Sequence, residues 1–159
     1  MRAVITGASS GIGLEFARVL HKKGYDLTLI ARRKERLEKL KTEFGDKTKT
    51  ITADLSQRSE VFRAFEEACG DDVSILINNA GFGLCGSFFE TDISRELEMI
   101  DTNAAAVHIL TKLFLRDFTA KNKGYILNVA SSAAFMPGPL LSSYYASKAY
   151  VLRLDRAVN

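Results

Sequence analysis

Short apolar runs rich in β-branched residues alternate along the chain with longer segments whose apolar residues recur at helical spacing. The runs around Val4, Leu29, Ile75 and Ile126 are continuous, as in parallel strands buried on both faces. Strict alternation of strand and helix predicts a right-handed, doubly wound α/β fold with a parallel sheet. The expected strands are Ala3–Thr6, Asp26–Ala31, Thr48–Thr52, Ser74–Asn78 and Tyr125–Ala130, and the expected long helices are Gly13–Lys23, Arg33–Phe44, Arg58–Cys69 and Ala104–Ala120, with a shorter one beginning near Asp92.

Length and composition restrict the class of protein. With 159 residues, 47% of them hydrophobic and 26% charged, the chain has the size of one globular domain (residues 1–159). It has no apolar run long enough to predict a membrane span, and no signal peptide precedes the first strand. Cys69 and Cys85 fit neither a disulfide framework nor a metal site, so we expect a cytoplasmic protein without a metal. The net charge of +3 lies largely on mixed-charge segments, and no nucleic-acid or membrane partner is expected.

A glycine-rich turn joins the first expected strand to the first helix. Gly7, Gly11 and Gly13 stand in Thr6-Gly7-Ala8-Ser9-Ser10-Gly11-Ile12-Gly13. Glycine lets a phosphate approach the backbone N–H groups closely, and the following helix N-terminus adds its positive dipole end. Glycines often serve only a tight turn, but between a buried strand and an amphipathic helix they indicate a dinucleotide pyrophosphate site.

The end of the second expected strand indicates which nucleotide binds. NAD sites usually carry an acid there for the ribose hydroxyls, whereas arginine accommodates the 2′-phosphate of NADP. Here Arg32 and Arg33 follow Ala31, and the first acid is Glu35. Because a guanidinium is a permanently charged donor fork, the sequence favours NADP over NAD, with Arg32 the preferred contact. The alternative is that both arginines are only the solvated start of a helix.

Tyr144 and Lys148 are four residues apart and share one face of a predicted helix. A free tyrosine, with a pKa of about 10, is a poor acid–base group at neutral pH. A lysine ammonium one turn away favours the phenolate and lowers that pKa. Taken alone, the pair also fits an ordinary surface tyrosine and lysine.

With this pair, the chain resembles the short-chain dehydrogenase/reductase family in its TGxxxGxG form. The shared motifs extend over the whole chain: Thr6 to Gly13, Asp54 in Ala53-Asp54-Leu55, Asn78-Asn79-Ala80-Gly81, Asn103, Ser131 and Tyr144-x-x-x-Lys148. The resemblance implies a Rossmann-type, three-layer α/β/α domain that binds NAD(P). It also implies that the cofactor is contacted by Gly7, Ser9, Ser10, Gly11, Ile12, Gly13, Arg32, Arg33, Asp54, Leu55, Asn79, Ala80, Gly81, Tyr144 and Lys148.

By the same resemblance, the reaction is hydride transfer between nicotinamide and a carbonyl or secondary alcohol carbon. Tyr144 moves the oxygen-bound proton, Lys148 and Asn103 belong to the proton relay, and a serine polarises the substrate oxygen. The family's serine lies thirteen positions before its tyrosine, which selects Ser131, with Ser132 a second choice. The substrate is a small molecule whose identity is open, and residues 82–89 and 133–141 are expected to border its pocket.

Members of the family continue past the Tyr-Lys helix with two further strands and a substrate-covering lobe. We therefore expect a domain that is incomplete at its C-terminus, lacks the usual last strands and exposes the edge of its fifth strand. An alternative function follows: a truncated member that binds NAD(P) or self-associates with little or no turnover. A homodimer or larger homo-oligomer is also expected from the resemblance. An apolar stripe on the helix expected at 104–120 would supply the contact, or would simply cover the sheet.

Overall fold

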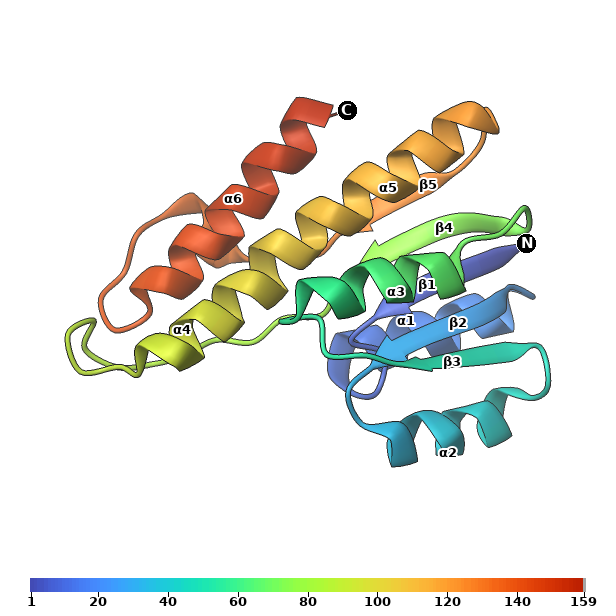
Figure 1. Ribbon diagram of the computed structural model, residues 1–159, viewed down its shortest axis with the longest axis horizontal. Coiled ribbons are helices and arrows are strands. Elements are labelled where there is room, and N and C mark those ends of the chain that lie inside the picture. The colour runs from blue at the N-terminus through green and yellow to red at the C-terminus, as the bar shows by residue number, and fades with distance from the viewer. Residues whose placement is uncertain (159) are drawn as a thin grey trace.

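The computed structural model describes residues 1–158, and Asn159 lies outside the described residues. Five strands form one sheet in the order β3-β2-β1-β4-β5, and all neighbouring strands are parallel. This order, with helices on both faces, confirms the doubly wound α/β fold predicted from the alternating pattern (Figure 1). The strands are β1 (Arg2–Thr6), β2 (Asp26–Ala31), β3 (Thr48–Thr52), β4 (Val73–Asn78) and β5 (Tyr125–Asn128).

Two helical layers cover the sheet because successive residues of a strand point to opposite faces. Helices α1 and α2 bury one face, where Ala17 and Leu37 meet Ile5 and Leu29. Helices α3 and α5 bury the other face, and α6 lies beside α5 (Figure 1). The helices are α1 (Gly11–Lys22), α2 (Lys34–Phe44), α3 (Arg58–Ala68), α4 (Ile93–Ile100), α5 (Ala106–Ala120) and α6 (Ser142–Val158), with a 3₁₀ turn η2 (Ser132–Phe135) before α6.

The long helix expected at 104–120 differs from the prediction at its start. Helix α4 continues through a wider, π-helical turn, η1 (Asp101–Ala105), directly into α5. Within η1, the fully buried Asn103 turns inward and binds both backbone groups of Phe82. Because a π-helical turn depends on such a contact with a distant segment, the helical spacing of the sequence does not reveal it.

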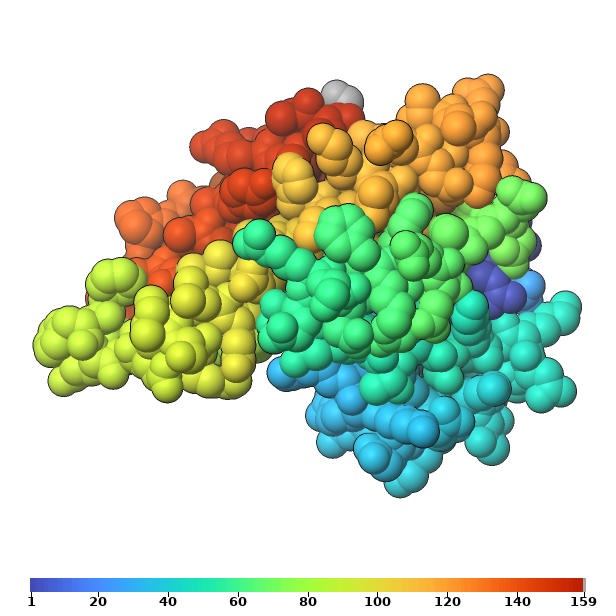
Figure 2. Space-filling model, in the orientation of Figure 1, coloured from blue at the N-terminus to red at the C-terminus, as the bar shows by residue number. Residues whose placement is uncertain are grey.

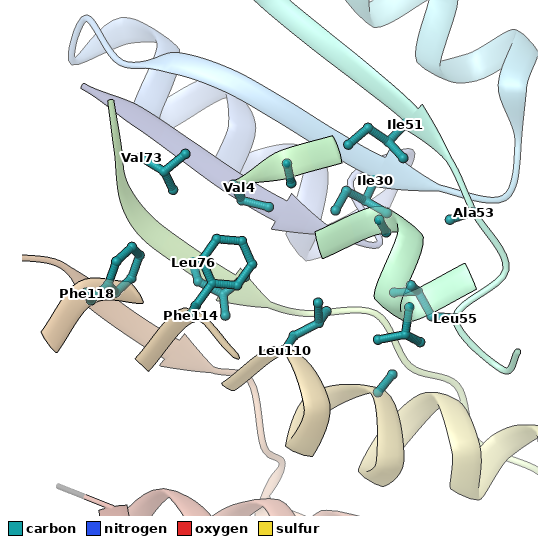
Figure 3. Packing of buried hydrophobic residues seen from close by; sticks show 14 residues of the cluster. Val4, Ile30, Ile51, Ala53, Leu55, Val73, Leu76, Leu110, Phe114 and Phe118 are labelled. Carbon is teal, nitrogen blue, oxygen red and sulfur yellow. The ribbon is translucent and has the colours of Figure 1, made fainter. Parts of the chain in front are cut away.

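The core over the α3 and α5 face of the sheet centres on aromatic side chains (Figure 3). Phe114 is fully buried, with Phe65 edge-on to it at a ring-centroid distance of 5.0 Å and Phe118 at 5.7 Å. The apolar stripe of α5 therefore covers the sheet, which is one of the two roles expected from the sequence, the other being a contact between subunits. Self-association stays a prediction. The members of this stripe are Val107, Leu110, Thr111, Phe114 and Phe118, all of them buried.

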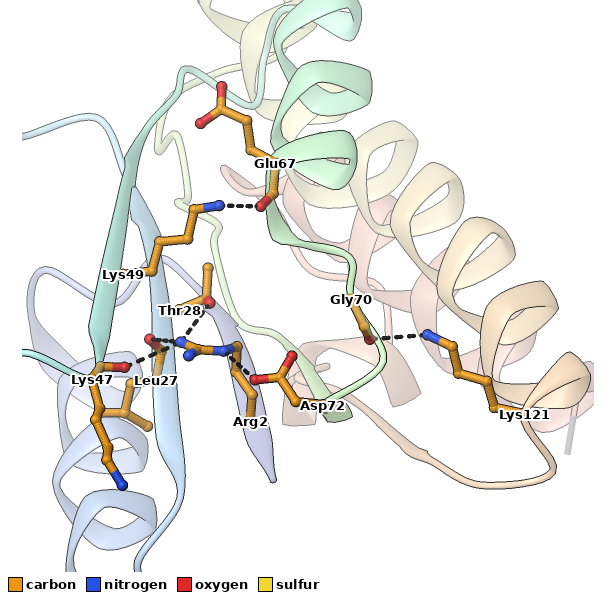
Figure 4. A network of polar contacts seen from close by, with 9 residues as sticks. All are labelled: Arg2, Leu27, Thr28, Lys47, Lys49, Glu67, Gly70, Asp72 and Lys121. Carbon is orange, nitrogen blue, oxygen red and sulfur yellow. Dashed lines mark hydrogen bonds and ion pairs between the residues drawn. The ribbon is translucent and has the colours of Figure 1, made fainter.

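Polar contacts fasten the amino-terminal edge of the sheet (Figure 4). The Arg2 guanidinium donates from Nε to Asp72 (2.8 Å) and from Nη1 to the carbonyls of Leu27 (2.9 Å) and Lys47 (3.2 Å). One side chain thus joins β1 to β2 and to the segments before β3 and β4. These contacts stabilise the sheet at the edge opposite to the strand ends that carry the functional motifs.

Strand β5 ends at Asn128, two residues before its predicted end. Past that point the carbonyl of Val129 accepts from Lys148 Nζ. Within residues 1–158, β5 pairs with β4 alone, and the apolar side chains of Tyr125 and Leu127 are 79% and 44% exposed. The described residues therefore show the uncovered fifth strand that the sequence predicts.

Replacing Phe114 by alanine tests the aromatic centre of the core. We expect Phe114→Ala to lower the free energy of unfolding by about 3–5 kcal/mol, because it removes two ring contacts and leaves a cavity. Phe62→Ala on α3 is the matched control: its ring is 47% exposed, and its loss should cost under about 1 kcal/mol. Urea unfolding followed by circular dichroism measures both, and equal losses would contradict this account of the core.

Candidate cofactor-binding and catalytic site

A cleft of about 550 Å³ opens at the carboxyl-terminal edge of the sheet. Parallel strands bring their carboxyl ends to one edge, so the segments that follow β1, β2, β3, β4 and β5 meet there. Of the residues that the sequence assigned to the cofactor, all but Gly13 line this cleft, and their role in binding stays a prediction. They are Gly7, Ser9, Ser10, Gly11, Ile12, Arg32, Arg33, Asp54, Leu55, Asn79, Ala80, Gly81, Tyr144 and Lys148.

The glycine-rich turn is braced by the segment after β4. The side-chain amide of Asn79 donates to the carbonyls of Thr6 (3.1 Å) and Gly7 (3.4 Å). In return, the Thr6 hydroxyl accepts from the backbone N–H groups of Asn79 and Ala80, both at 3.0 Å. A Cβ on Gly13 would overlap the Asn79 amide and the Gly7 carbonyl. Gly13 is therefore buried behind the turn, and its lack of a side chain permits this close packing.

An arginine lies against the same turn. The Arg33 guanidinium donates from Nη2 to the hydroxyls of Ser9 (3.0 Å) and Ser10 (2.7 Å), while Arg32 lines the cleft beside it. The sequence had favoured Arg32 as the phosphate contact, but Arg33 is the one that the structure joins to the glycine turn. The positive charge of the guanidinium is thus brought next to the backbone N–H groups that open α1.

The predicted acid–base pair lies at the other end of the cleft, on the first turns of α6. Lys148 is only 6% exposed, and its Nζ donates to the carbonyl of Val129 (2.9 Å). The same Nζ lies 6.0 Å from the centre of the Tyr144 ring. Burial lowers the pKa of the Lys148 ammonium. A Cβ on Gly83 would lie 3.5 Å from Tyr144 Cδ2, so the loop after β4 borders this ring.

Asn103 lies behind the cleft rather than in its lining. Its Oδ1 accepts from the Phe82 N–H (3.0 Å), and its Nδ2 donates to the Phe82 carbonyl (2.8 Å) and to the Ser147 hydroxyl (3.2 Å). The Ser147 hydroxyl in turn donates to the carbonyl of Tyr144 (2.8 Å). Asn103 therefore connects the loop after β4 to the turn that holds both members of the acid–base pair.

Ser131, the predicted polarising serine, precedes the 3₁₀ turn η2. Its hydroxyl accepts from the backbone N–H of Ala133 (3.2 Å), which fixes the side chain as the cap of that turn. Neither Ser131 nor the exposed Ser132 is part of the cleft lining. The catalytic role of either serine stays a prediction.

Several lining residues were not assigned by the sequence. Ala31, Ala53 and Ala130 lie at or just after the expected strand ends, and Phe82 was expected only to border the substrate pocket, whereas Thr102 and Val129 were not expected to line the site. Val129 could have been identified as a lining residue from its place in the sequence, because it directly follows β5. Thr102 and the link through Ser147 depend on the π-helical turn η1 and carry no signal of their own in the sequence.

Among residues 1–158, no three histidine, cysteine or acidic side chains are grouped as a metal site requires. No helix within the same residues has the length and apolarity needed to traverse a bilayer.

Known proteins resemble this chain over nearly its whole length. The sequence pattern of the family described as short chain dehydrogenase matches residues 1–159. The chain is 36% identical to 17-beta-hydroxysteroid dehydrogenase type 3 of Homo sapiens, covering 98% of this chain and 52% of that protein. It is 35% identical to very-long-chain 3-oxoacyl-CoA reductase of Anas platyrhynchos, covering 99% and 53%. The structure matches a short-chain dehydrogenase from Sphingobium yanoikuyae in complex with NADPH with a TM-score of 0.92 and 33% identity, covering 99% and 64%. The chain thus spans about half the length of the curated relatives it matches.

The lowered pKa of Lys148 predicts a pH-dependent stability. The folded chain loses this proton at lower pH than the unfolded chain, whose lysine titrates near 10.5. Between the two pKa values the unfolded state binds more protons, so the unfolding free energy rises with pH. We expect the stability of the wild type relative to Lys148→Met to increase from about pH 7 to about pH 10. Urea unfolding at both pH values measures this difference. The exposed Lys112 provides the control Lys112→Met, which should show no such trend.

Proposed function

Because the chain belongs to the short-chain dehydrogenase/reductase family, we propose that it is an oxidoreductase that transfers a hydride between NADP and a carbonyl or secondary alcohol carbon. One observation carries the proposal: the Tyr144–Lys148 turn of α6 and the glycine turn after β1 line the same cleft. The chain covers about half of its curated relatives, so the activity of the whole protein is part of this proposal.

The residues present fit a dinucleotide. A Cβ on Gly7 would lie 2.8 Å from the Cα of Ala80, and Gly7 has a φ of +66°, so only glycine lets the turn pack this closely against the segment after β4. The start of α1 offers unpaired N–H groups and its dipole to a pyrophosphate. The Asp54 carboxylate, which accepts from the Ser56 N–H (3.1 Å), lines the cleft and, by the family resemblance, would contact the adenine ring. When bound, the nicotinamide supplies the redox chemistry, and the protein supplies orientation and electrostatics.

The preference for NADP over NAD rests on the two arginines after β2. Arg33 is already hydrogen-bonded to Ser9 and Ser10, so its guanidinium is preorganised at the turn. A 2′-phosphate near these serines would accept from the same nitrogen atoms, whereas the ribose hydroxyl of NAD offers no charge to pair with. No acid stands at the end of β2 to bind that hydroxyl, since Glu35 is already within α2.

The proton on the substrate oxygen is assigned to Tyr144. Its hydroxyl would give that proton in reduction, and its phenolate oxygen would accept the proton in oxidation. The Lys148 ammonium, held at the Val129 carbonyl and one helical turn away, stabilises the phenolate form. Ser131 would hydrogen-bond the substrate oxygen. Asn103 would be the last member of the proton relay. It lies behind Tyr144 and Lys148 and is hydrogen-bonded to Ser147, which is in the same helical turn.

The walls around Tyr144 favour an apolar substrate. No charged residue occurs in residues 73–89 or 124–147, which include both loops that approach Tyr144. The two loops are joined by the Gly86 N–H, which donates to the Leu140 carbonyl (2.8 Å), and they expose Phe88, Phe89, Phe135 and Met136. Two relatives are named for steroid and very-long-chain acyl substrates. We therefore propose that the substrate is a carbonyl compound whose part next to the reacting carbon is large, apolar and uncharged.

Turnover and nucleotide binding together test the proposed function. We expect the chain to bind NADPH saturably and to oxidise it with apolar ketones at least about tenfold faster than with keto acids of similar size, because a carboxylate would be buried without a partner. Tyr144→Phe should reduce turnover by about 100-fold or more while leaving NADPH affinity within about threefold. Tyr145→Phe, one residue away and in contact with Gly138, is the control. NADPH binding without oxidation of the nucleotide by any ketone would contradict the enzyme and favour a binding protein.

Nucleotide selectivity is tested separately at Arg33. Arg33→Ala should weaken NADPH binding by about tenfold or more and leave NADH binding nearly unchanged, because only NADPH carries the 2′-phosphate. Arg36→Ala, on the exposed surface of α2, is the matched control. Calorimetric titration with both nucleotides measures the ratio. Equal losses of affinity for NADPH and NADH would mean that Arg33 only supports the glycine turn and does not bind the 2′-phosphate.

A further inference from the structure

A chain of polar side chains crosses the molecule from the sheet to α6. Asn78 on β4 donates from Nδ2 to Thr111 on α5 (3.1 Å) and to Asn128 Oδ1 on β5 (2.8 Å). The Thr111 hydroxyl also donates to Asn128 Oδ1 (3.2 Å), and Asn128 Nδ2 donates to Asp155 Oδ1 on α6 (2.9 Å). Asn78 and Thr111 are each only 2% exposed. We call this set of Asn78, Thr111, Asn128 and Asp155 the polar bridge.

The polar bridge has a direction. Asn128 Oδ1 receives hydrogen bonds from Asn78 and Thr111, so its amide N–H groups must face α6. Asn78 keeps both of its donors engaged although its own Oδ1 is buried without a partner among the described residues. In each hydrogen bond of the polar bridge, the donor comes before its acceptor in the order Asn78, Thr111, Asn128, Asp155. The residue at position 155 must therefore accept a hydrogen bond. A carboxylate is the strongest acceptor available among side chains.

Asp155 and Lys148 attach α6 to neighbouring residues at the end of β5. Lys148 Nζ donates to the carbonyl of Val129, and Asp155, seven residues further along α6, accepts from the side chain of Asn128. Seven residues are two helical turns, so both side chains lie on the face of α6 that is turned to the sheet. Val151 lies between them on that face and is fully buried.

We propose that Asp155 is a positioning residue for the acid–base pair: its carboxylate ends the polar bridge and holds α6 at the distance from β5 at which the Lys148 ammonium reaches the Val129 carbonyl. The proposal rests on the proposed function, in which that ammonium sets the ionisation of Tyr144. Asp155 does not line the cleft, so it acts through Lys148 and Tyr144 and not on the substrate. Without Asp155, Lys148 still binds the Val129 carbonyl, but α6 is held less firmly to the strand end and the ammonium gains freedom to move away from the phenol.

The charge of Asp155 and its position make opposite predictions for Tyr144. If Asp155 acted only as a distant negative charge, removing it would lower the pKa of Tyr144, because a nearby carboxylate disfavours phenolate. If it acts by positioning Lys148, removing it raises the pKa of Tyr144, because the ammonium is no longer held in place. The sign of the change therefore separates the two roles, and a loss of overall stability reproduces neither.

The test follows the titration of Tyr144 by NMR in chain labelled with ¹³C at the tyrosine Cζ and saturated with NADP⁺, with Tyr144→Phe to assign the signal. We expect Asp155→Ala to raise the pKa of Tyr144 by about half a unit or more. Asp155→Asn, which keeps an acceptor without the charge, should leave it within about 0.2 unit of the wild type or slightly lower. Asp155→Glu keeps the charge but displaces the acceptor and should also raise it. Arg153→Ala, on the exposed side of α6, is the control.

Circular dichroism first establishes that each variant is folded, and Asp155→Glu decides the question if the alanine variant is not. An unchanged or lower pKa of Tyr144 in both the alanine and the glutamate variants would overturn the positioning role, as would an asparagine variant that behaves like alanine. Failure of the proposed function looks different: Tyr144 in the wild type would then titrate like the other tyrosines, with or without NADP⁺.

Discussion

A parallel sheet places the carboxyl ends of all its strands along one edge, and the cleft of this protein depends on that constraint. The glycine turn, the arginines after β2, Asp54, the Asn79 segment and the Val129 carbonyl come from distant parts of the sequence but from the same edge of the sheet. The opposite edge is fastened by Arg2 and carries no part of the cleft. The residues of the cleft and the contacts of Arg2 thus lie at opposite ends of the strands.

Buried polar groups at this edge are stabilised by backbone atoms more than by opposite charges. Lys148 is held at a carbonyl, Asn103 binds both backbone groups of Phe82, and Asn79 binds the carbonyls of the glycine turn. A backbone carbonyl cannot rotate away as a carboxylate side chain can, and within residues 1–158 the polar partner of the Lys148 ammonium is such a carbonyl. Under the proposed function, the ammonium charge would therefore act on the phenol and on a bound nucleotide.

The sequence predicted the fold well because apolar periodicity and chain order determine it locally. Strands β2 and β3 begin and end as expected, and Asp92 caps α4 near the predicted start of the shorter helix. The placement of most cofactor-assigned residues followed from motifs that sit at strand ends. What could not be predicted depends on contacts between distant segments: the inward turn of Asn103 toward Phe82, the pairing of Arg33 with two serines, and the polar bridge to Asp155. None of these has a periodic signal.

The brace between Asn79 and the glycine turn has a consequence for how the molecule is made. Both partners are present once synthesis has passed β4, whereas α6 and its phenol emerge much later in the order of the chain. The two partners of this brace can therefore meet before the segment that carries the proposed acid–base pair has been synthesised.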